Sequence, residues 1–354
     1  MRGRLLAFVA IVAVTLTGVG LYVAVRPGSP TSDSAAAESA SRSAIPALPL
    51  APVTTTPDVT VPPGEPPTRL LFRRTSRDAQ AGMLALAPLS DPSAVAVFDA
   101  LRCERLHMAG GRGVCLTADR GVFTTFTARV FDATFKPSAS IPLAGVPSRV
   151  QVSPDGTHAG ITVFVAGHSY ADGGFSTRTS VMDLSTGGWL IEDFESLTVH
   201  DKGGVRRAAD FNFWGVTFAR DSRRFYATLR TAGQPLLVKG ELGSGRVDVV
   251  ATDVECPSLS PDNRRVAFKQ RDGAGLAGIR WRLWVLDLAS GERHALAETR
   301  NVDDQVQWLD DATIVYALPA EGRPAEMDEW IVPADGTGTP ALLIRRAYSA
   351  AVIR

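Results

Sequence analysis

The chain has 354 residues, 45% of them hydrophobic and 21% charged, and is long enough to bury a sizeable core. Its 37 basic and 37 acidic residues cancel, and no basic stripe favours a nucleic-acid partner. Three cysteines without a C-x-x-C motif argue against structural zinc. We therefore expect no nucleic-acid partner, no metal and no cofactor.

Residues 1–26 are predicted to form a transmembrane signal-anchor. Arg2 and Arg4 precede residues 5–25, which carry no charge and are long enough to span a bilayer. A secretory hydrophobic region usually has about 7–15 residues and ends in an A-x-A-like site, which this segment lacks. The arginines favour a cytoplasmic N-terminus, with the rest of the chain outside the cell membrane. A cleaved signal peptide is the alternative.

Residues 27–67 form the next segment, which is rich in Pro, Ser, Thr and Ala and nearly free of large apolar residues. Such a composition cannot bury a core, so we expect an extended, disordered linker. The linker would hold the globular part, residues 68–354, away from the membrane.

A repeated unit predicts the fold of residues 68–354. Residues 152–156 read Val-Ser-Pro-Asp-Gly, residues 259–263 read Leu-Ser-Pro-Asp-Asn, and each is followed by a short apolar run. The aspartate side chain accepts a backbone N–H two residues on, which is typical of a tight turn between strands. Looser copies place the turn aspartate at Asp119, Asp221 and Asp311. Apolar residues five and three positions before each aspartate alternate with small or polar ones, as in a half-buried strand.

The repeat predicts four antiparallel strands in about 40–50 residues, which is typical of a β-propeller blade. Five units begin near Arg112, Ser148, Phe213, Glu255 and Asp304. An incomplete unit of three strands precedes them, and one extra strand at 347–353 follows them. We therefore predict an all-β, six-bladed β-propeller in which the C-terminal strand completes the first blade. The closed ring is expected to be a monomer.

Counting back seven residues from each turn aspartate predicts a rim at one mouth of the central channel. The predicted rim residues are Arg112, Ser148, Trp214, Glu255 and Asp304. Two acids, an arginine and a tryptophan on one rim would make a binding surface for a partner or ligand. The alternative is that the polar groups satisfy one another and nearby backbone, and that Trp214 caps the core.

Cys103 and Cys115 flank a glycine-rich bend at 109–113. In an oxidising compartment they are predicted to form a local disulfide, and two buried free thiols are the alternative. Cys256 is left over and is expected to be buried.

The sequence predicts no catalytic site. Residues 167–171 read Gly-His-Ser-Tyr-Ala and lack the closing glycine of a G-x-S-x-G nucleophile motif. The acidic pair at 310–311 occupies a turn, and the five histidines lack metal-ligand spacing. The long connection at 192–212 contains a predicted hairpin turn at 200–204. We expect this connection either to contact a partner or to cover an open blade edge.

The Ser-Pro-Asp-Gly and Ser-Pro-Asp-Asn turns resemble the WD40-like (PD40) repeats of the TolB propeller. Residues 210–218, 255–262 and 303–310 also resemble a membrane-anchored TolB-like group of actinobacteria. The resemblance implies a six-bladed propeller that acts in the bacterial cell envelope through protein contacts, without catalysis. The chain departs from TolB, which has a signal peptide and a small α/β domain in place of the anchor and linker. The partners of the TolB system therefore do not carry over.

Together these features predict a membrane-anchored extracytoplasmic propeller that is a non-catalytic interaction scaffold. Its partner would be an envelope protein or a cell-wall component. The alternative is an enzyme, or a sensor of a small ligand or cation, that uses the channel mouth.

Overall fold

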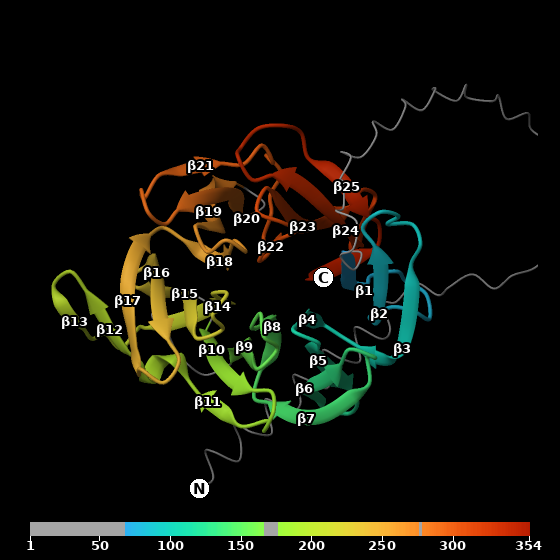
Figure 1. Ribbon diagram of the computed structural model, residues 1–354, viewed down its shortest axis with the longest axis horizontal. Helices are drawn as coiled ribbons and strands as arrows, with labels where there is room; N and C mark the ends of the chain where they lie inside the picture. The colour runs from blue at the N-terminus through green and yellow to red at the C-terminus, as the bar shows by residue number, and fades with distance from the viewer. Residues whose placement is uncertain (1–67, 166–175, 276–277) are drawn as a thin grey trace, which may run out of the picture. The chain divides into compact units, whose positions relative to one another are not determined.

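The computed structural model describes residues 68–165, 176–275 and 278–354. In this part of the chain, six sheets surround a central axis, each running from an inner strand to the perimeter (Figure 1). The prediction of an all-β, six-bladed propeller is therefore confirmed. The predicted anchor and linker, residues 1–67, lie outside the described residues. None of the described helical structure reaches the length and hydrophobicity that a transmembrane span requires.

The strands of each blade follow one another from the inner strand outward. Blades 1 to 3 are β26 (Ala347–Ile353), β1 (Arg69–Arg74), β2 (Met83–Pro88), β3 (Ala96–Arg102); β4 (Arg105–Ala109), β5 (Arg112–Arg120), β6 (Thr124–Asp132), β7 (Pro137–Leu143); β8 (Val146–Val152), β9 (His158–Val165), β10 (Ser176–Asp183), β11 (Trp189–Ile191). Blades 4 to 6 are β14 (Asn212–Phe218), β15 (Arg224–Thr231), β16 (Gln234–Glu241), β17 (Arg246–Thr252); β18 (Glu255–Leu259), β19 (Arg265–Gly275), β20 (Gly278–Asp287), β21 (Arg293–Ala295); β22 (Gln307–Trp308), β23 (Thr313–Ala320), β24 (Arg323–Pro333), β25 (Ala341–Ile344).

The hydrophobic core lies between neighbouring blades. Val114 and Val130 of blade 2 pack with Ile161 and Met182 of blade 3, and all four are buried. Burying an aliphatic side chain of this size contributes about 1.5–3 kcal/mol. The strand alternation in the sequence therefore places its apolar face against the next blade around the ring.

The turn aspartates hold the inner hairpins as the sequence predicts. The Asp155 carboxylate accepts hydrogen bonds from Thr157 N at 2.9 Å and from Ser153 Oγ at 2.7 Å. Partial burial alone would raise the pKa of Asp155, but these hydrogen bonds outweigh it and hold the pKa at about 2. Asp310 accepts from Ala312 N at 2.7 Å, so the acidic pair at 310–311 is part of a turn.

Blade 2 departs from the predicted repeat. Its inner strand is β4, and Arg112 begins the second strand, β5, so the predicted blade start near Arg112 is wrong. The inner hairpin turns at Gly110 and Gly111, which both have positive φ. A Cβ on Gly110 would lie 2.3 Å from the Asp155 carbonyl carbon, so glycine is required there. Because this turn has no aspartate, the repeat was aligned on Asp119 near the end of β5. The second strand of the blade was therefore taken for the inner strand.

Cys103 and Cys115 form the predicted disulfide, and Cys256 is buried and free. The bond ties the connection between blades 1 and 2 to β5, and its half-cystines are separated by 12 residues.

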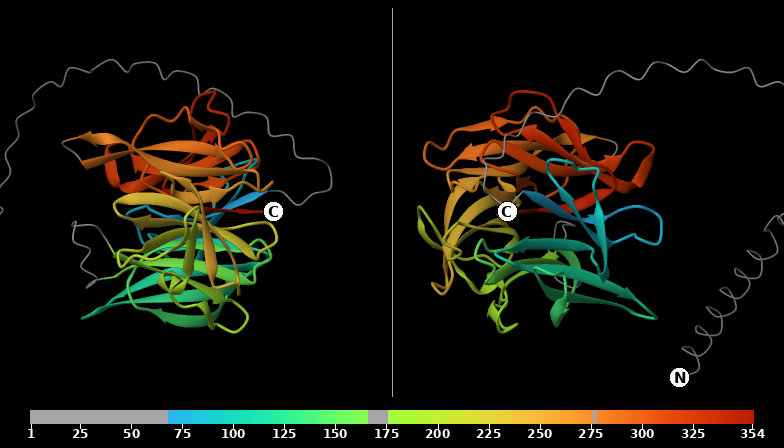
Figure 2. Two further views of the ribbon diagram at one scale, coloured as in Figure 1. Left: turned by 90° about the vertical axis from the view of Figure 1, so that its left-hand side faces the viewer. Right: turned by 45° about the vertical axis from the view of Figure 1, so that its right-hand side comes forward.

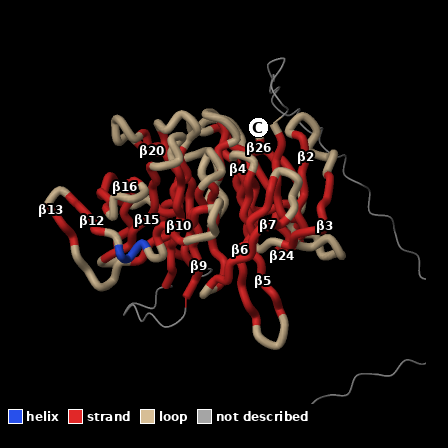
Figure 3. Tube along the Cα trace, turned by 60° about the horizontal axis from the view of Figure 1, so that its bottom comes forward, coloured by secondary structure: helices blue, strands red, loops and turns tan. Residues whose placement is uncertain are grey.

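The long connection before β14 forms an edge hairpin. β12 (Thr198–Asp201) pairs in parallel with β17, and β13 (Gly204–Arg206) pairs with β12. Figures 1 and 3 both show this hairpin at the perimeter of the ring, beyond blade 4. The hairpin covers the outer edge of β17. This agrees with the prediction that the connection covers an open blade edge.

The ring closes where the last strand of the chain pairs with the first. β26 pairs antiparallel with β1, with Leu70 opposite Val352 and Leu71 opposite Ala351. The two strands lie side by side in Figures 1 and 2. The predicted closure by the C-terminal strand is confirmed, and it covers the inner edge of β1.

Ending the chain before Ala347 should abolish cooperative folding. The truncation exposes the inner edge of β1 and removes the buried residues Ala347, Ala350 and Ala351, against a total stability of about 5–15 kcal/mol. Thermal unfolding followed by circular dichroism tests this, with deletion of Arg354 alone as the control. A truncated chain that melts at the parent temperature would refute the closure argument.

Candidate functional site

The central channel has two different mouths. The six inner strands are adjacent around the axis, and residues at their C-terminal ends line one shared cavity. Residues at or near their N-terminal ends gather at the opposite side, among them Arg105, Arg149, Asp304 and Ser349. We call the second side the closed mouth and the cavity on the first side the funnel.

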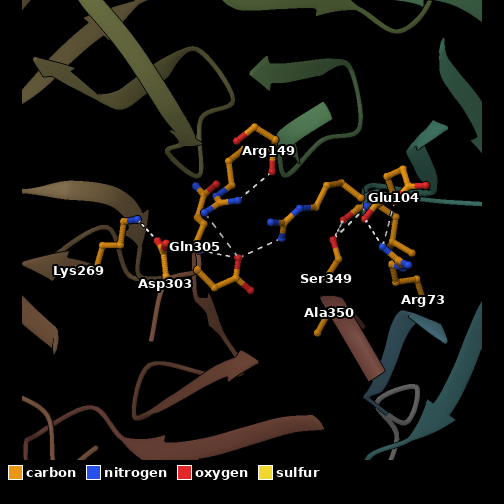
Figure 4. A network of polar contacts seen from close by, with 12 residues as sticks. Arg73, Glu104, Arg149, Lys269, Asp303, Gln305, Ser349 and Ala350 are labelled. Carbon is orange, nitrogen blue, oxygen red and sulfur yellow. Dashed lines mark hydrogen bonds and ion pairs between the residues drawn. The ribbon is translucent and has the colours of Figure 1, made fainter. Parts of the chain in front are cut away.

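An ion network crosses the closed mouth (Figure 4). Arg105 of blade 2 donates from Nη1 to Asp304 Oδ1 at 3.0 Å, and Arg149 Nη2 of blade 3 lies 3.9 Å from the same oxygen. The Asp304 side chain is only 8% exposed. Gln305 donates to the Pro257 carbonyl at 3.0 Å and to the Val216 carbonyl at 3.3 Å. These contacts join blades 2 to 6 across the axis.

Blade 1 joins the network through β26 and β1. The Arg105 guanidinium lies 4.4 Å from the centre of the Tyr348 ring, and Ser349 Oγ bonds with both the N–H and the carbonyl of Leu106 at 3.0 Å. Burial raises the pKa of Tyr348 to about 12. Arg73 donates to the Glu104 carbonyl at 2.9 Å. The closed mouth is therefore filled by groups that bond one another, although Arg73 Nε and Arg149 Nε have no hydrogen-bond partner among the described residues.

Glu255 lies at the edge of this network. Its Oε1 is 3.6 Å from Arg271 Nε, and burial raises the pKa of its carboxyl. Lys269 pairs with Asp303 and lies 4.2 Å from the centre of the Trp281 ring.

The structure brings together part of the predicted rim. Asp304 is central to the closed mouth, Glu255 begins β18, and the Ser148 carbonyl accepts from Arg149 Nη1 at 2.9 Å. Trp214 is 4% exposed inside β14. Arg112 is exposed at the start of β5, the end of that strand nearest the turn with β4, so it does not belong to this rim.

Sequence reasoning missed Arg105, Arg149 and Tyr348. Counting back seven residues from Gly111 instead of Asp119 gives Glu104, the neighbour of Arg105. The sequence signal for this strand was the Gly110–Gly111 turn, which takes the place of the Pro-Asp turn found in other blades. The pairing of Arg105 with Asp304, 199 residues apart, has no local signal.

A small cavity of about 20 Å³ lies beneath the closed mouth, next to Glu329. Glu329 is 2% exposed, and its Oε1 accepts from Ala350 N at 3.2 Å. Burial raises the pKa of Glu329 well above its ordinary value, and the nearby Asp304 carboxylate raises it further. The protonated form of Glu329 is therefore favoured to a higher pH than that of an exposed glutamate.

The funnel is the larger space, about 650 Å³. Ligand pockets commonly span about 300–1,000 Å³. Its walls combine polar and apolar groups, with Phe135, Phe218, Trp308 and Ile353 among the apolar lining residues. His107 also lines it, and its Nδ1 accepts from Val152 N at 3.0 Å. Burial lowers the pKa of His107 to about 4, so the ring is neutral at physiological pH.

The charged side chains that line the funnel are of one sign. Arg69, Arg220 and Arg354 line it, and no Asp or Glu does so among the described residues. Within the described ranges, no three His, Cys, Asp or Glu side chains are grouped so that they could hold a metal ion. The arrangement suits recognition of another molecule.

No family model and no curated protein sequence matches the chain. Among solved structures, TolB from Acinetobacter baumannii is similar with a TM-score of 0.56 and 16% identity, over 80% of this chain and 66% of that chain. A nidogen/laminin complex chain has a TM-score of 0.54 and 13% identity, over 80% of this chain and 98% of that one. A TolB-like β-propeller is therefore the class of fold, and these likenesses extend to the fold alone.

Replacing Asp304 with Asn should destabilise the protein by about 3–5 kcal/mol, because Arg105 and Arg149 lose their shared carboxylate inside the channel. Asp248→Asn is the control, since Asp248 and Arg246 are about half exposed and solvent screens such a surface pair, which leaves it little effect on stability. Urea unfolding measures both. Equal effects of the two substitutions would contradict the central role of Asp304.

Replacing Glu329 with Gln should change how stability depends on pH. The folded pKa of Glu329 is raised, so its contribution to stability is complete below the ordinary glutamate pKa and is lost as pH rises towards the folded pKa. Gln keeps the acceptor for Ala350 and does not ionise.

The free energy of unfolding of Glu329→Gln should therefore rise relative to the parent as the pH increases from the ordinary glutamate pKa of about 4 towards the raised folded pKa. Urea unfolding across this range measures it, with the exposed Glu321→Gln as the control. A difference from the parent that stays constant with pH would show that Glu329 does not titrate as argued.

Proposed function

We propose that this chain is a membrane-anchored, outward-facing propeller that binds an envelope protein or a cell-wall component through its funnel, without catalysis. The observation that carries the proposal is the contrast between the two mouths. One is occupied by paired arginines and carboxylates, whereas the other opens into about 650 Å³ lined by the ends of all six inner strands. Such a concave site, assembled from every blade, favours a binding role.

The location of the protein is part of the proposal. Residues 5–25 are uncharged and follow two arginines, which favours a single membrane span with a cytoplasmic N-terminus. The Cys103–Cys115 disulfide is typical of an oxidising compartment outside the cytosol. The Pro-rich segment 27–67 would give the propeller reach from the membrane.

The likeness to known propellers also supports a binding role. The fold is similar to TolB, and another similar structure is a complex of nidogen with laminin. The resemblance of 210–218, 255–262 and 303–310 to a membrane-anchored TolB-like group points the same way.

We place the partner site at the funnel and not at the predicted rim. Asp304 is already held by Arg105, and Glu255 is 3% exposed. A ligand or cation sensor at this mouth would have to break these internal pairs, at a cost of several kcal/mol.

A funnel-blocking variant tests the proposal. Ile353 lines the funnel and is half-buried, so Ile353→Trp adds bulk there. The matched control is Val250→Trp, at a 46% exposed position on the outer strand β17. The tagged full chain is crosslinked in cells, and captured molecules are quantified by mass spectrometry.

We expect Ile353→Trp to reduce capture of a specific envelope component about ten-fold or more at an unchanged melting temperature, with Val250→Trp close to the parent. Capture that survives the blocked funnel would place the partner site elsewhere.

A further inference from the structure

The charge of the funnel indicates which partner chemistry it takes. We propose that the funnel binds an extended, acidic peptide segment, with side-chain carboxylates at Arg69 and Arg220 and apolar side chains against the inner walls. This inference rests on the proposed function and specifies the partner at that same site.

Arg69 and Arg220 supply two of the positive charges that line the funnel. Arg69 begins β1, Arg220 lies in the turn after β14, and both are exposed. Within the described ranges, neither guanidinium has an ion pair, whereas Arg224 in the same turn pairs with Asp221 and Arg265 pairs with Asp262. The third arginine, Arg354, donates from Nη2 to the Leu309 carbonyl at 2.6 Å.

Among the described residues, the aspartates of the neighbouring turns do not pair with these arginines. Asp155 accepts from Thr157 and Ser153 within its own turn, and Asp262 accepts from Arg264 N at 2.9 Å. Asp221 is held by Arg224. Each turn thus holds its own acid, and a carboxylate supplied by a partner would complete charge-assisted pairs at Arg69 and Arg220.

The walls favour a peptide over a simple anion. Met108, Phe135, Phe218 and Trp308 are core residues, each 9% exposed or less, that contribute apolar atoms to the lining, and Asn263 and Gln307 add amide groups. Trp308 is oriented by a hydrogen bond from its Nε1 to the Ser258 carbonyl at 2.8 Å. A volume of about 650 Å³ admits a short segment of chain but no folded domain. An extended segment with alternating acidic and apolar residues satisfies both kinds of surface.

Phage display of random decapeptides tests this on the purified full chain in detergent. Parallel selections use the parent, the double variant Arg69→Gln/Arg220→Gln, and Ile353→Trp. Arg264→Gln is the matched control, because Arg264 is an exposed turn arginine that does not line the funnel. Melting temperatures verify that every variant folds.

The parent should enrich acidic peptides with apolar residues. Their affinity should fall about ten-fold in the double variant, as two partly exposed charge pairs are lost, and fall with added salt. Ile353→Trp should abolish their binding, and Arg264→Gln should leave it unchanged. Neutral or basic peptides that need an open funnel but not the two arginines would overturn the acidic specificity while leaving the proposed function intact. Enriched peptides that are insensitive to Ile353→Trp would overturn the funnel as the binding site.

Discussion

The pairing of β26 with β1 is the contact on which the rest of the structure depends. It joins the last strand of the chain to the first described one, with Leu71 opposite Ala351. Without it, blade 1 would have no inner strand and the channel would have a gap on one side. The same strand supplies Tyr348 and Ser349 to the closed mouth and Ile353 to the funnel. Closure therefore completes the fold and both ends of the channel at once.

The two ends of the channel differ because their residues serve different purposes. At the closed mouth, Asp304 attracts Arg105 and Arg149 from other blades, and these buried charges persist only because they are paired. At the funnel, the chain leaves Arg69 and Arg220 without carboxylate partners among the described residues. Within the described part of the chain, the closed mouth therefore holds ion-paired charges, whereas the funnel holds arginines without a carboxylate partner, and only the funnel has charge available to a binding partner.

Much of the fold could be predicted because each turn aspartate is a local signal. Asp155 and Asp262 bond their own turn backbone, so their chemistry is visible in a few consecutive residues. The prediction failed in blade 2, where Gly110 and Gly111 make the same turn without an aspartate. The glycines allow the same backbone turn, but they have no side chain that marks the repeat. The spacing was therefore counted from the next aspartate along the chain, which placed the predicted inner strand at β5.

The site was less predictable than the fold. Asp304 and Glu255 were found by spacing, but their partners were not. Arg105 and Asp304 meet only because the ring closes, and the funnel is lined by residues from 69 to 354. Which polar groups are paired and which remain free is decided by such distant contacts. Spacing alone therefore indicated the mouth where Glu255 and Asp304 lie. In the structure, both of these carboxylates are held by ion pairs within the chain.

Site-specific photo-crosslinking in cells tests the central claim most directly. A photoreactive amino acid is placed at Asn263, which lines the funnel, or at Arg120, which is 68% exposed and pairs with Glu104 near the closed mouth. The account predicts a discrete crosslinked partner from position 263 and none from position 120. A partner captured from position 120 and not from position 263 would contradict it.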